Sequence, residues 1–318
     1  MLLIVDGNNI AYRAHFTPQG ALTKKDGTPS GVIKGFLESI RVYLQKFPET
    51  ERVIVCWDTG RAKWRTEVYP DYKENRDYGA EDVEKKESFE ALWNQIDVLH
   101  EILPKFGIQS IRLGGWEADD LVYRVATMFG DEFTHAMVAT ADKDMFQLVN
   151  DKVSIYKPGN KFKESVVLSP LNFKEEVGVE QSAYIGYKAL IGDPSDNIFG
   201  VPGIGEKTAK NLINKYGHIN NILGAQGADL KALMKSKRNA RIFEPENLKR
   251  LGINNKIMNF QYVPEDPEVT KLVANALTCE VPRMNTKEIK AILMEWQFVS
   301  ILSSFQSWIF PYMGLETD

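Results

Sequence analysis

The stretch LLIVDGNN, residues 2–9, is a short apolar run that ends in a carboxylate, Asp6. The run RVIVCWD, residues 52–58, repeats this arrangement and ends in Asp58. Three further short runs follow: QSIRL (109–113), HAMVAT (135–140) and VSIYK (153–157). Runs that are this short and this apolar are typical of β-strands covered on both faces. We therefore predict a strand at each of these positions.

Helical patterns lie between these runs. Five apolar residues recur at helical spacing after the first run: Val32, Phe36, Ile40, Tyr43 and Phe47. Thr28 and Pro29 are the predicted N-cap and first-turn proline of that helix. A second helix is predicted over roughly residues 88–103, and a third begins near Glu117. Strands that alternate with helices predict an α/β fold with a mostly parallel sheet.

The pattern changes near Pro170, where the run VVLSP ends and helical signals begin to dominate. We place a domain boundary there, which gives an α/β domain over residues 1–170. A length of 318 residues fits one large domain followed by a smaller one. Residues 61–86 differ from both parts because they are polar, charged and without a steady apolar stripe. We expect this segment to be an excursion from the sheet.

Composition narrows the class of protein. Apolar residues make up 43% of the chain and charged residues 26%, as in an ordinary globular protein. Cys56 and Cys279 are too few for a disulfide framework, and the four histidines show no zinc-like spacing. The apolar start MLLIV is too short for a signal peptide or a membrane span. We expect a cytoplasmic protein that makes no membrane contact.

The net charge of −4 at first argues against a nucleic-acid partner. Net charge averages over the whole surface, however, and an acidic site can mask local basic patches. The segment KSKRNAR, residues 235–241, carries four positive charges and no negative one. It is either such a basic patch or an ordinary solvated helix face.

Carboxylates follow each of the first four runs. They are Asp6, Asp58, Glu117, Asp119, Asp120, Asp142 and Asp144. The carboxyl ends of the strands in an open α/β sheet form the crevice where ligands bind. Each acid alone has an ordinary explanation as a helix N-cap or a turn residue. Two carboxylates about 5 Å apart repel by roughly 3 kcal/mol at an effective dielectric of about 20, so a set of seven must be partly protonated or neutralised by metal ions.

Ligand sets made only of oxygen favour Mg²⁺ or Mn²⁺ over zinc. Two such ions about 4 Å apart can activate a water molecule and stabilise the leaving oxygen of an in-line displacement. Phosphodiester hydrolysis is the chemistry that this arrangement indicates.

The stretch LIGDPSDNIFGVPGIGEKTA, residues 190–209, adds Asp193 and Asp196, which would bring the acids to nine. At positions i and i+3 these two can share one face of a helical turn. The segment GVPGIG that follows, residues 200–205, is predicted to be a tight turn that enters a helix. Glycines permit close backbone approach, and a helix N-terminus presents free amides to an anion. The stretch suggests a protein that grips one phosphate while it cuts another.

With these motifs assembled, the chain resembles the 5′ nuclease family, which comprises flap endonucleases, stand-alone phage 5′ nucleases and the 5′→3′ exonuclease domain of bacterial DNA polymerase I. The matching stretches, in the family's order, are LLIVDGNN, VIVCWD, YPDYKENR, EADDL, ADKDMFQLV and GDPSDNIFGVPGIGEKTA. The resemblance implies a PIN-like α/β domain, a helical arch at about residues 61–86, and a helix-hairpin-helix region over 171–264 that binds duplex DNA. Residues 265–318 match no family motif, and their apolar stretch EIKAILMEWQFVSILSSF is expected to form a helical tail that packs on the body.

The resemblance also implies roles for the acids and for the arch. Implied metal ligands are Asp6, Asp58, Glu117, Asp119, Asp142, Asp144, Asp193 and Asp196, with Asp120 beside them at the catalytic site. In the arch motif YKxxR, one helical turn would let Lys73 and Arg76 reach the scissile phosphate together. Tyr72 could stack on an unpaired base. Arg61 and Arg65 are weaker candidates for phosphate contact, and a solvated charged helix is the alternative explanation of the whole motif.

In the family, the hairpin holds a K⁺ ion through backbone carbonyls while its amides meet a DNA phosphate. The matching carbonyls are those of Val201 and Ile204, and the matching turn includes Gly203 and Gly205. Lys207 and Lys210 are neighbouring candidates for phosphate contact, with an ordinary surface role as the alternative.

The sequence thus predicts a divalent-metal-dependent, structure-specific 5′ nuclease that leaves 5′-phosphate and 3′-hydroxyl ends, acting in replication or repair and including primer removal. Expected substrates are DNA with 5′ flaps, forks or 5′ ends, with RNA–DNA hybrid as a further candidate. We expect a monomer with two or more Mg²⁺ or Mn²⁺ ions, and K⁺ at the hairpin. One alternative is a PIN-type ribonuclease on single-stranded RNA, which would need neither arch nor hairpin. A second is a Toprim-like site, in which Asp6 and Asp58 would have no role. The third is a catalytically inactive DNA-structure-binding module.

Overall fold

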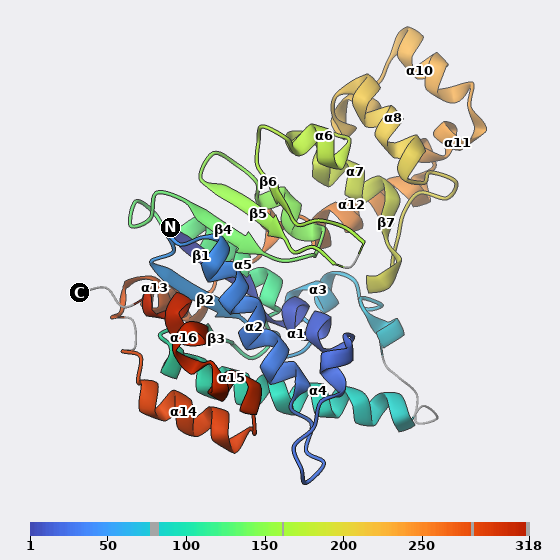
Figure 1. Ribbon diagram of the computed structural model, residues 1–318. Helices are drawn as coiled ribbons and strands as arrows, with labels where there is room; N and C mark the ends of the chain where they lie inside the picture. Colours follow the sequence, from blue (N-terminus) through green and yellow to red (C-terminus); the bar gives the residue numbers. More distant parts are fainter. Residues whose placement is uncertain (77–82, 161, 281–282, 316–318) are drawn as a thin grey trace.

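The computed structural model describes residues 1–76, 83–160, 162–280 and 283–315. Its centre is a six-stranded sheet in the order β3-β2-β1-β4-β5-β6, in which β1 to β5 are parallel and β6 pairs antiparallel with β5 (Figure 1). The strands are β1 (Leu2–Asp6), β2 (Arg52–Cys56), β3 (Gln109–Ile111), β4 (Ala136–Ala139), β5 (Val153–Lys157) and β6 (Val166–Leu168). The predicted strands and the mostly parallel sheet are confirmed.

Helices cover both faces of the sheet. Those of the first half are α1 (Gly7–His15), α2 (Gly31–Lys46), α3 (Lys63–Val68), α4 (Val83–Ile102) and α5 (Ala118–Met128). Alternate side chains of a strand point to opposite faces. Leu2 and Ile4 of β1 accordingly pack with α5, whereas Leu3 and Val5 pack with α2 and α4. This burial on both faces explains why the central strand is apolar throughout.

Short 3-10 helices join many of these elements. They are η1 (Pro18–Ala21), η2 (Glu74–Arg76), η3 (Leu103–Phe106), η4 (Asp144–Leu148), η5 (Gln181–Ala183), η6 (Pro194–Asp196), η7 (Arg241–Phe243) and η8 (Phe260–Tyr262). Of the segment predicted as an arch, residues 77–82 lie outside the described residues.

The predicted start of α2 is wrong. The helix begins at Gly31 with Ser30 in the N-cap position, not at Thr28 and Pro29. Pro29 instead forms a bridge with Thr23, and the Thr28 carbonyl accepts a hydrogen bond from Lys24 N at 2.8 Å. A local turn therefore uses the residues that helix-capping preferences assign to the helix.

Because β1 to β4 are parallel, their carboxyl ends lie at one edge of the sheet. In the register, Asp6 is paired with Cys56, and Val5 with Ala139. Residues that directly follow these strands therefore come out side by side. This edge carries the candidate site.

Helices dominate after residue 170, and α8, α10 and α11 lie at one end of the molecule (Figure 1). The helices are α6 (Phe173–Val177), α7 (Tyr184–Ile191), α8 (Glu206–Tyr216), α9 (Ile219–Leu223), α10 (Gly227–Met234), α11 (Lys237–Ala240) and α12 (Pro245–Met258). The apolar helix α7 packs against α12 and α8. A two-stranded hairpin of β7 (Gly192–Asp193) and β8 (Ile198–Phe199) joins α7 to the glycine-rich turn.

The last four helices return to the α/β domain. They are α13 (Pro267–Thr278), α14 (Thr286–Glu295), α15 (Val299–Ser303) and α16 (Phe305–Met313). Helix α13 packs against α5 and β3, and α16 packs against α2. Tyr312 is buried and its hydroxyl donates to the Leu37 carbonyl at 2.6 Å. Among the described residues, no helix is both long enough and apolar enough to cross a membrane.

Candidate metal centre

Asp6 ends β1 and caps α1, since its Oδ1 accepts a hydrogen bond from Asn9 N at 3.0 Å. Its second oxygen accepts from the Thr140 hydroxyl at 2.8 Å, which ties β1 to the loop after β4. The side chain is buried. Burial, and then the charge of Asp142, raise the pKa of Asp6 to about 7. This carboxylate lies in an environment that disfavours its ionised form.

Asp58 follows β2 and its Oδ1 accepts from Ala118 N at 2.6 Å, at the start of α5. Burial is the main reason that the pKa of Asp58 rises to about 6, and the charge of Glu117 adds to the rise although Lys73 opposes it. In the first turn of α5, burial and the charges of Asp142 and Asp6 raise the pKa of Asp119 well above its usual range. Acids from three separate strand ends therefore act on one another.

The loop after β4 supplies Asp142 and Asp144, and Asp142 Oδ1 accepts from Asp144 N at 2.7 Å. Burial raises the pKa of Asp144 to about 6. The charge of Lys188 opposes this rise, and the charge of Asp142 adds to it. The Lys188 ammonium lies 2.6 Å from Asp144 Oδ1 and 3.1 Å from Asp193 Oδ2. Lys188 is itself buried, so it is an internal counter-ion for this part of the site.

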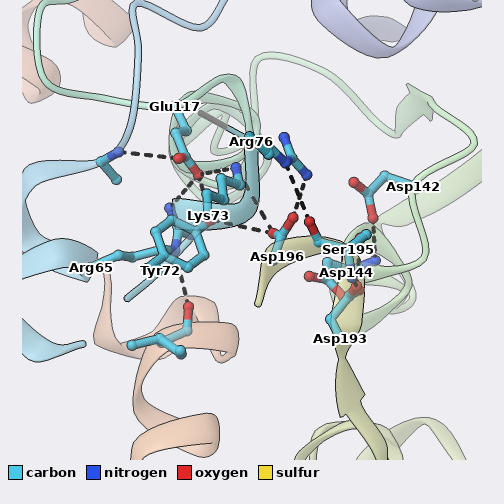
Figure 2. Close-up of polar contacts among 12 residues, drawn as sticks. Arg65, Tyr72, Lys73, Arg76, Glu117, Asp142, Asp144, Asp193, Ser195 and Asp196 are labelled. Atoms are coloured by element: carbon cyan, nitrogen blue, oxygen red, sulfur yellow. Dashed lines mark hydrogen bonds and ion pairs between the residues drawn. The ribbon is translucent and has the colours of Figure 1, made fainter. Parts of the chain in front are cut away.

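The turn that holds Asp193 and Asp196 is the 3-10 helix η6. Asp193 caps η6, and its Oδ1 accepts from Ser195 N at 3.0 Å, whereas Asp196 ends η6 and pairs with Arg76 (Figure 2). Burial acts to raise the pKa of Asp193, but Lys188 and Ser195 lower it below its usual range. Burial raises the pKa of Asp196 despite Lys73 and Arg76. A 3-10 turn thus directs the two acids to different cations.

The cations of the arch motif reach this site, but not from a regular helix. Lys73 has a left-handed backbone, with φ 56°, directly before η2. Its Nζ lies 3.0 Å from Glu117 Oε2 and 3.9 Å from Asp196 Oδ2. Arg76 is half exposed and pairs with Asp196 as well. Figure 2 shows both cations converging on the acids. The turn that joins them is a 3-10 turn, in which Arg76 N donates to the Lys73 carbonyl at 3.0 Å, and it brings both cations to Asp196.

Three other expectations need correction because the side chains concerned are buried. Tyr72 is only 3% exposed and donates to Glu117 Oε2 at 2.9 Å, so no face of its ring is open to a base. Arg65 is buried between Glu117, at 3.1 Å, and Asp120, at 2.9 Å. Asp120 is fully buried and completes the capping box of α5 with Glu117. These three side chains surround and orient Glu117 from behind.

Sequence reasoning overlooked Lys188. The helix YIGYKALI, α7, is apolar apart from this one lysine, and a lone charge in a buried helix is a signal for an internal ion pair. Arg61, a weaker candidate for phosphate contact, is half-buried in the loop between β2 and α3.

The candidate ligands lie at one edge of the sheet, but their oxygens do not surround a common point at which an ion could sit. In the described part of the chain, no group of three or more His, Cys, Asp or Glu side chains could enclose an ion as these side chains stand. Several carboxylates turn toward lysine or arginine instead (Figure 2). All of the donors are oxygens, and burial together with mutual repulsion raises most of their pKa values, as described above for Asp6, Asp58, Asp119 and Asp144. The set therefore fits hard divalent cations such as Mg²⁺ or Mn²⁺.

The glycine-rich turn adjoins this centre. Lys143, between two of the acids, lies 3.8 Å from Glu206, the first residue of α8. Val201 and Ile204 are buried, and the Val201 carbonyl accepts from Ile204 N at 3.0 Å. Gly203 has φ +84°, which favours glycine. Arg241 and Arg250 donate to the carbonyls of two neighbouring turn residues, Pro202 and Gly200.

The remaining hairpin candidates surround the start of α8. Gly205 is the N-cap residue of α8, and Lys207 is exposed on its first turn. Lys210 is half-buried, with its ammonium 5.7 Å from the centre of the Tyr187 ring. The turn thus enters a helix as predicted.

Comparison with known proteins identifies both halves of the chain. The profile of the 5′-3′ exonuclease N-terminal resolvase-like domain matches residues 1–178, and that of the 5′-3′ exonuclease C-terminal SAM fold matches residues 179–258. A 5′-3′ exonuclease of Bacillus subtilis is 37% identical over 225 residues, which cover 70% of this chain and 72% of that protein. The thermostable DNA polymerase I of Thermus thermophilus is 33% identical over 221 residues, which cover 70% of this chain and 24% of the polymerase.

Solved structures show the same fold. The T5 D15 protein co-crystallised with metal ions superimposes with a TM-score of 0.69 at 24% identity, over 87% of this chain and 99% of that one. The T5 5′-exonuclease with bound zinc has a TM-score of 0.64 at 25% identity, over 89% of this chain and 99% of that one. On the profile matches and the Bacillus relative, the chain belongs to the 5′-3′ exonuclease family.

Proposed function

We propose that this protein is a divalent-metal-dependent, structure-specific 5′ nuclease that hydrolyses DNA at 5′ ends, flaps and forks and leaves 5′-phosphate and 3′-hydroxyl ends. The observation that carries the proposal is the set of acids at one sheet edge, several of them with raised pKa values, beside the cations Lys73 and Arg76. Residues 1–170 form the catalytic domain, residues 171–264 bind DNA, and residues 265–318 support the body. The protein acts as a monomer in the cytoplasm, and RNA–DNA hybrid is a further substrate in replication and repair.

Two or more Mg²⁺ or Mn²⁺ ions are held by eight carboxylates: Asp6, Asp58, Glu117, Asp119, Asp142, Asp144, Asp193 and Asp196. When bound, the ions supply a nucleophile at neutral pH and neutralise charge on the leaving oxygen. The side chains of the protein do the rest. Lys73 and Arg76 bind the phosphate oxygens, and on substrate entry they exchange Glu117 and Asp196 for the phosphate. Arg65, Tyr72 and Asp120 hold Glu117 in place.

The hairpin region grips the duplex away from the cut. The amides at Gly203 and Gly205 donate to one phosphate at the start of α8, where the helix dipole favours an anion. Lys207 and Lys210 contact neighbouring phosphates, and Arg61 is a weaker contact beside the metal centre. In this proposal, the carbonyls of Val201 and Ile204 hold K⁺.

A cleavage assay tests the proposal. A labelled 5′-flap DNA is incubated with the protein while Mg²⁺ is titrated, with EDTA as the control and an RNA flap of matched sequence alongside. We expect cleavage of the DNA flap that rises with Mg²⁺ and stops in EDTA. The variants Asp144→Asn and Asp196→Asn should lose cleavage while DNA binding, measured in EDTA, is largely kept. Binding without cleavage by the unaltered protein would support the inactive binding module, and preference for the RNA flap would support the ribonuclease.

A further inference from the structure

A cleft of about 850 Å³ lies between the two domains that the family profiles match. Helices α5 and η4 of the first domain and α7, α9 and α12 of the second line it, together with η8. None of the nine acids at the sheet edge lines this cleft, and the function proposed above gives it no role. Ligand sites in proteins commonly have volumes of about 300–1,000 Å³, so the cleft is large enough to be one.

The lining of the cleft is uncharged. Among the described residues, no Asp, Glu, Lys or Arg lines it, although these four residue types make up 26% of the sequence. Contact with the phosphate backbone of DNA depends on cations, so the cleft is not a DNA-binding surface. Its polar residues are mainly Asn and Gln, among them Asn220, Asn255 and Gln261. A side-chain amide both donates and accepts hydrogen bonds, as a peptide main chain does, so the lining suits an uncharged partner with amide groups.

Several polar groups of the lining are free to bind such a partner. In the part of the chain that the structure describes, the side chains of Ser182, Asn220 and Gln261 have no hydrogen-bond partner. His218 Nδ1 accepts a hydrogen bond from Asn220 N at 3.1 Å. The neutral imidazole therefore carries its proton on Nε2, which is left as a donor. These groups can pair with the N–H and C=O groups of a polypeptide.

Gly252 lies in the interior of α12, on the face that lines the cleft. Apart from the backbone of the helix itself, a Cβ atom built there would have no heavy atom within 4 Å, and the backbone is not left-handed. Neither packing nor conformation therefore requires glycine at this position. Glycine in a helix interior costs about 1 kcal/mol relative to alanine. A ligand that approaches the backbone closely would account for this residue.

Two leucines extend the apolar surface of the cleft to its rim. Leu223 of α9 is 38% exposed and Leu248 of α12 is 41% exposed, and both line the cleft. Leu248 and Gly252 are four residues apart on α12, so they lie on one face of the helix. Small ligands are mostly enclosed by their sites. Exposed leucines around the opening instead favour an occupant that is part of a larger molecule and covers them.

Gln147 connects the cleft to the loop of the acids. It lines the cleft, and its Nε2 donates to the Asp144 carbonyl at 2.8 Å and to the Met258 carbonyl at 3.0 Å. Its Oε1 accepts from Phe260 N at 2.9 Å. An occupant of the cleft would therefore contact the junction between η4, which begins at Asp144, and the end of α12.

We propose that this cleft binds a short, uncharged peptide segment of a partner protein. Two apolar side chains of the segment pack on Leu223 and Leu248, its main chain crosses the open backbone at Gly252, and its amides pair with the side chains of the lining. Contact with Gln147 places the partner beside the loop that carries Asp144. The inference does not depend on the proposed nuclease function, because it concerns a surface outside the metal centre.

Short random peptides displayed on phage are the probe, and they are selected on the immobilised, unaltered protein. We expect enriched sequences with two large apolar residues and no charged residue. The enriched peptides are then synthesised with a fluorescent label, and their Kd is measured by anisotropy. Gly252→Phe covers the open backbone with a ring, so it should weaken peptide binding by about tenfold or more. The matched control Lys249→Phe adds the same ring to an exposed position of α12 outside the lining, and it should bind as the unaltered protein does.

A second pair of variants keeps the test independent of how Gly252→Phe folds. Ser182→Glu places a charge in the uncharged lining and should weaken peptide binding, whereas Ser182→Thr stays neutral and should not. Melting curves check the fold of every variant. The inference is overturned if no peptide is enriched, if the enriched peptides are charged, or if Gly252→Phe and Ser182→Glu bind them as the unaltered protein does. Neutral small molecules that raise the melting temperature of the unaltered protein but not of Gly252→Phe, without any enriched peptide, would assign the cleft to a small ligand instead.

Discussion

Lys73 is the cation with the most direct link between the arch segment and the acids. Its ammonium lies 3.0 Å from Glu117 Oε2, and its backbone N donates to the Asp196 carbonyl at 2.9 Å. If Lys73 binds the scissile phosphate in the transition state, Lys73→Ala should slow cleavage about 100-fold or more, the usual cost of one such donor. Single-turnover rates at saturating enzyme and Mg²⁺ measure this, and a melting curve checks the fold. Lys73→Ala that cleaves at the original rate would contradict a catalytic role.

Lys188 supports a different prediction, because it is buried between Asp144 and Asp193. Lys188→Met leaves two partly buried carboxylates without their cation, which typically costs about 3 kcal/mol or more. A bound divalent ion can take over that neutralising role. We expect a loss of unfolding free energy in EDTA that is much smaller in Mg²⁺, measured by urea denaturation. An equal loss in both conditions would show that Lys188 and the metal ions act independently.

At the scale of elements, two of the three glycines in the turn before α8, Gly203 and Gly205, have different backbone conformations. Gly203 has φ +84°, which an L side chain rarely adopts, whereas Gly205 has φ −91° and open space where a Cβ would lie. Gly203→Ala should therefore destabilise the protein by about 1 kcal/mol, and Gly205→Ala by less than about 0.5 kcal/mol. Urea denaturation measures both. If DNA approaches the turn closely, Gly205→Ala weakens flap binding without a stability loss, and unaltered binding would place the phosphate elsewhere.

The elements also show what the sequence could and could not predict. Strands such as β1 are predictable because burial on both faces makes a local run apolar. The edge where the acids gather follows from parallel pairing. The partners of Arg65 were not predictable, because they come from Glu117, Asp120 and the Ile257 carbonyl, all more than 50 residues away. Nor was the left-handed backbone at Lys73, since lysine has no local preference for it.

At the scale of the whole molecule, the buried acids make the stability of the folded protein depend on pH. The folded-state pKa is about 7 for Asp6 and about 6 for Asp58 and Asp144, each raised chiefly by burial from an ordinary value of 3.8. The folded protein therefore binds these protons more tightly than the unfolded chain does. Stability from this source is fully present below about pH 4 and is lost as the pH rises through 6 to 7.

Divalent ions should reverse that loss, because they bind the ionised carboxylates of the folded state and not the unfolded chain. In EDTA, we expect the melting temperature to fall between pH 5 and pH 8. In saturating Mg²⁺ it should fall much less, so the difference between the two curves widens with pH, by roughly 2 °C for each kcal/mol of linkage. Asp144→Asn removes one of these carboxylates, so this variant should narrow the difference between the two curves. The control is Asp131→Asn, which changes an exposed acid remote from the site and should leave the difference unchanged. The buried acids with pKa values of about 6 to 7 lie at this edge of the sheet. Melting curves in EDTA and Mg²⁺ that run parallel with pH would therefore mean that the ions do not bind there.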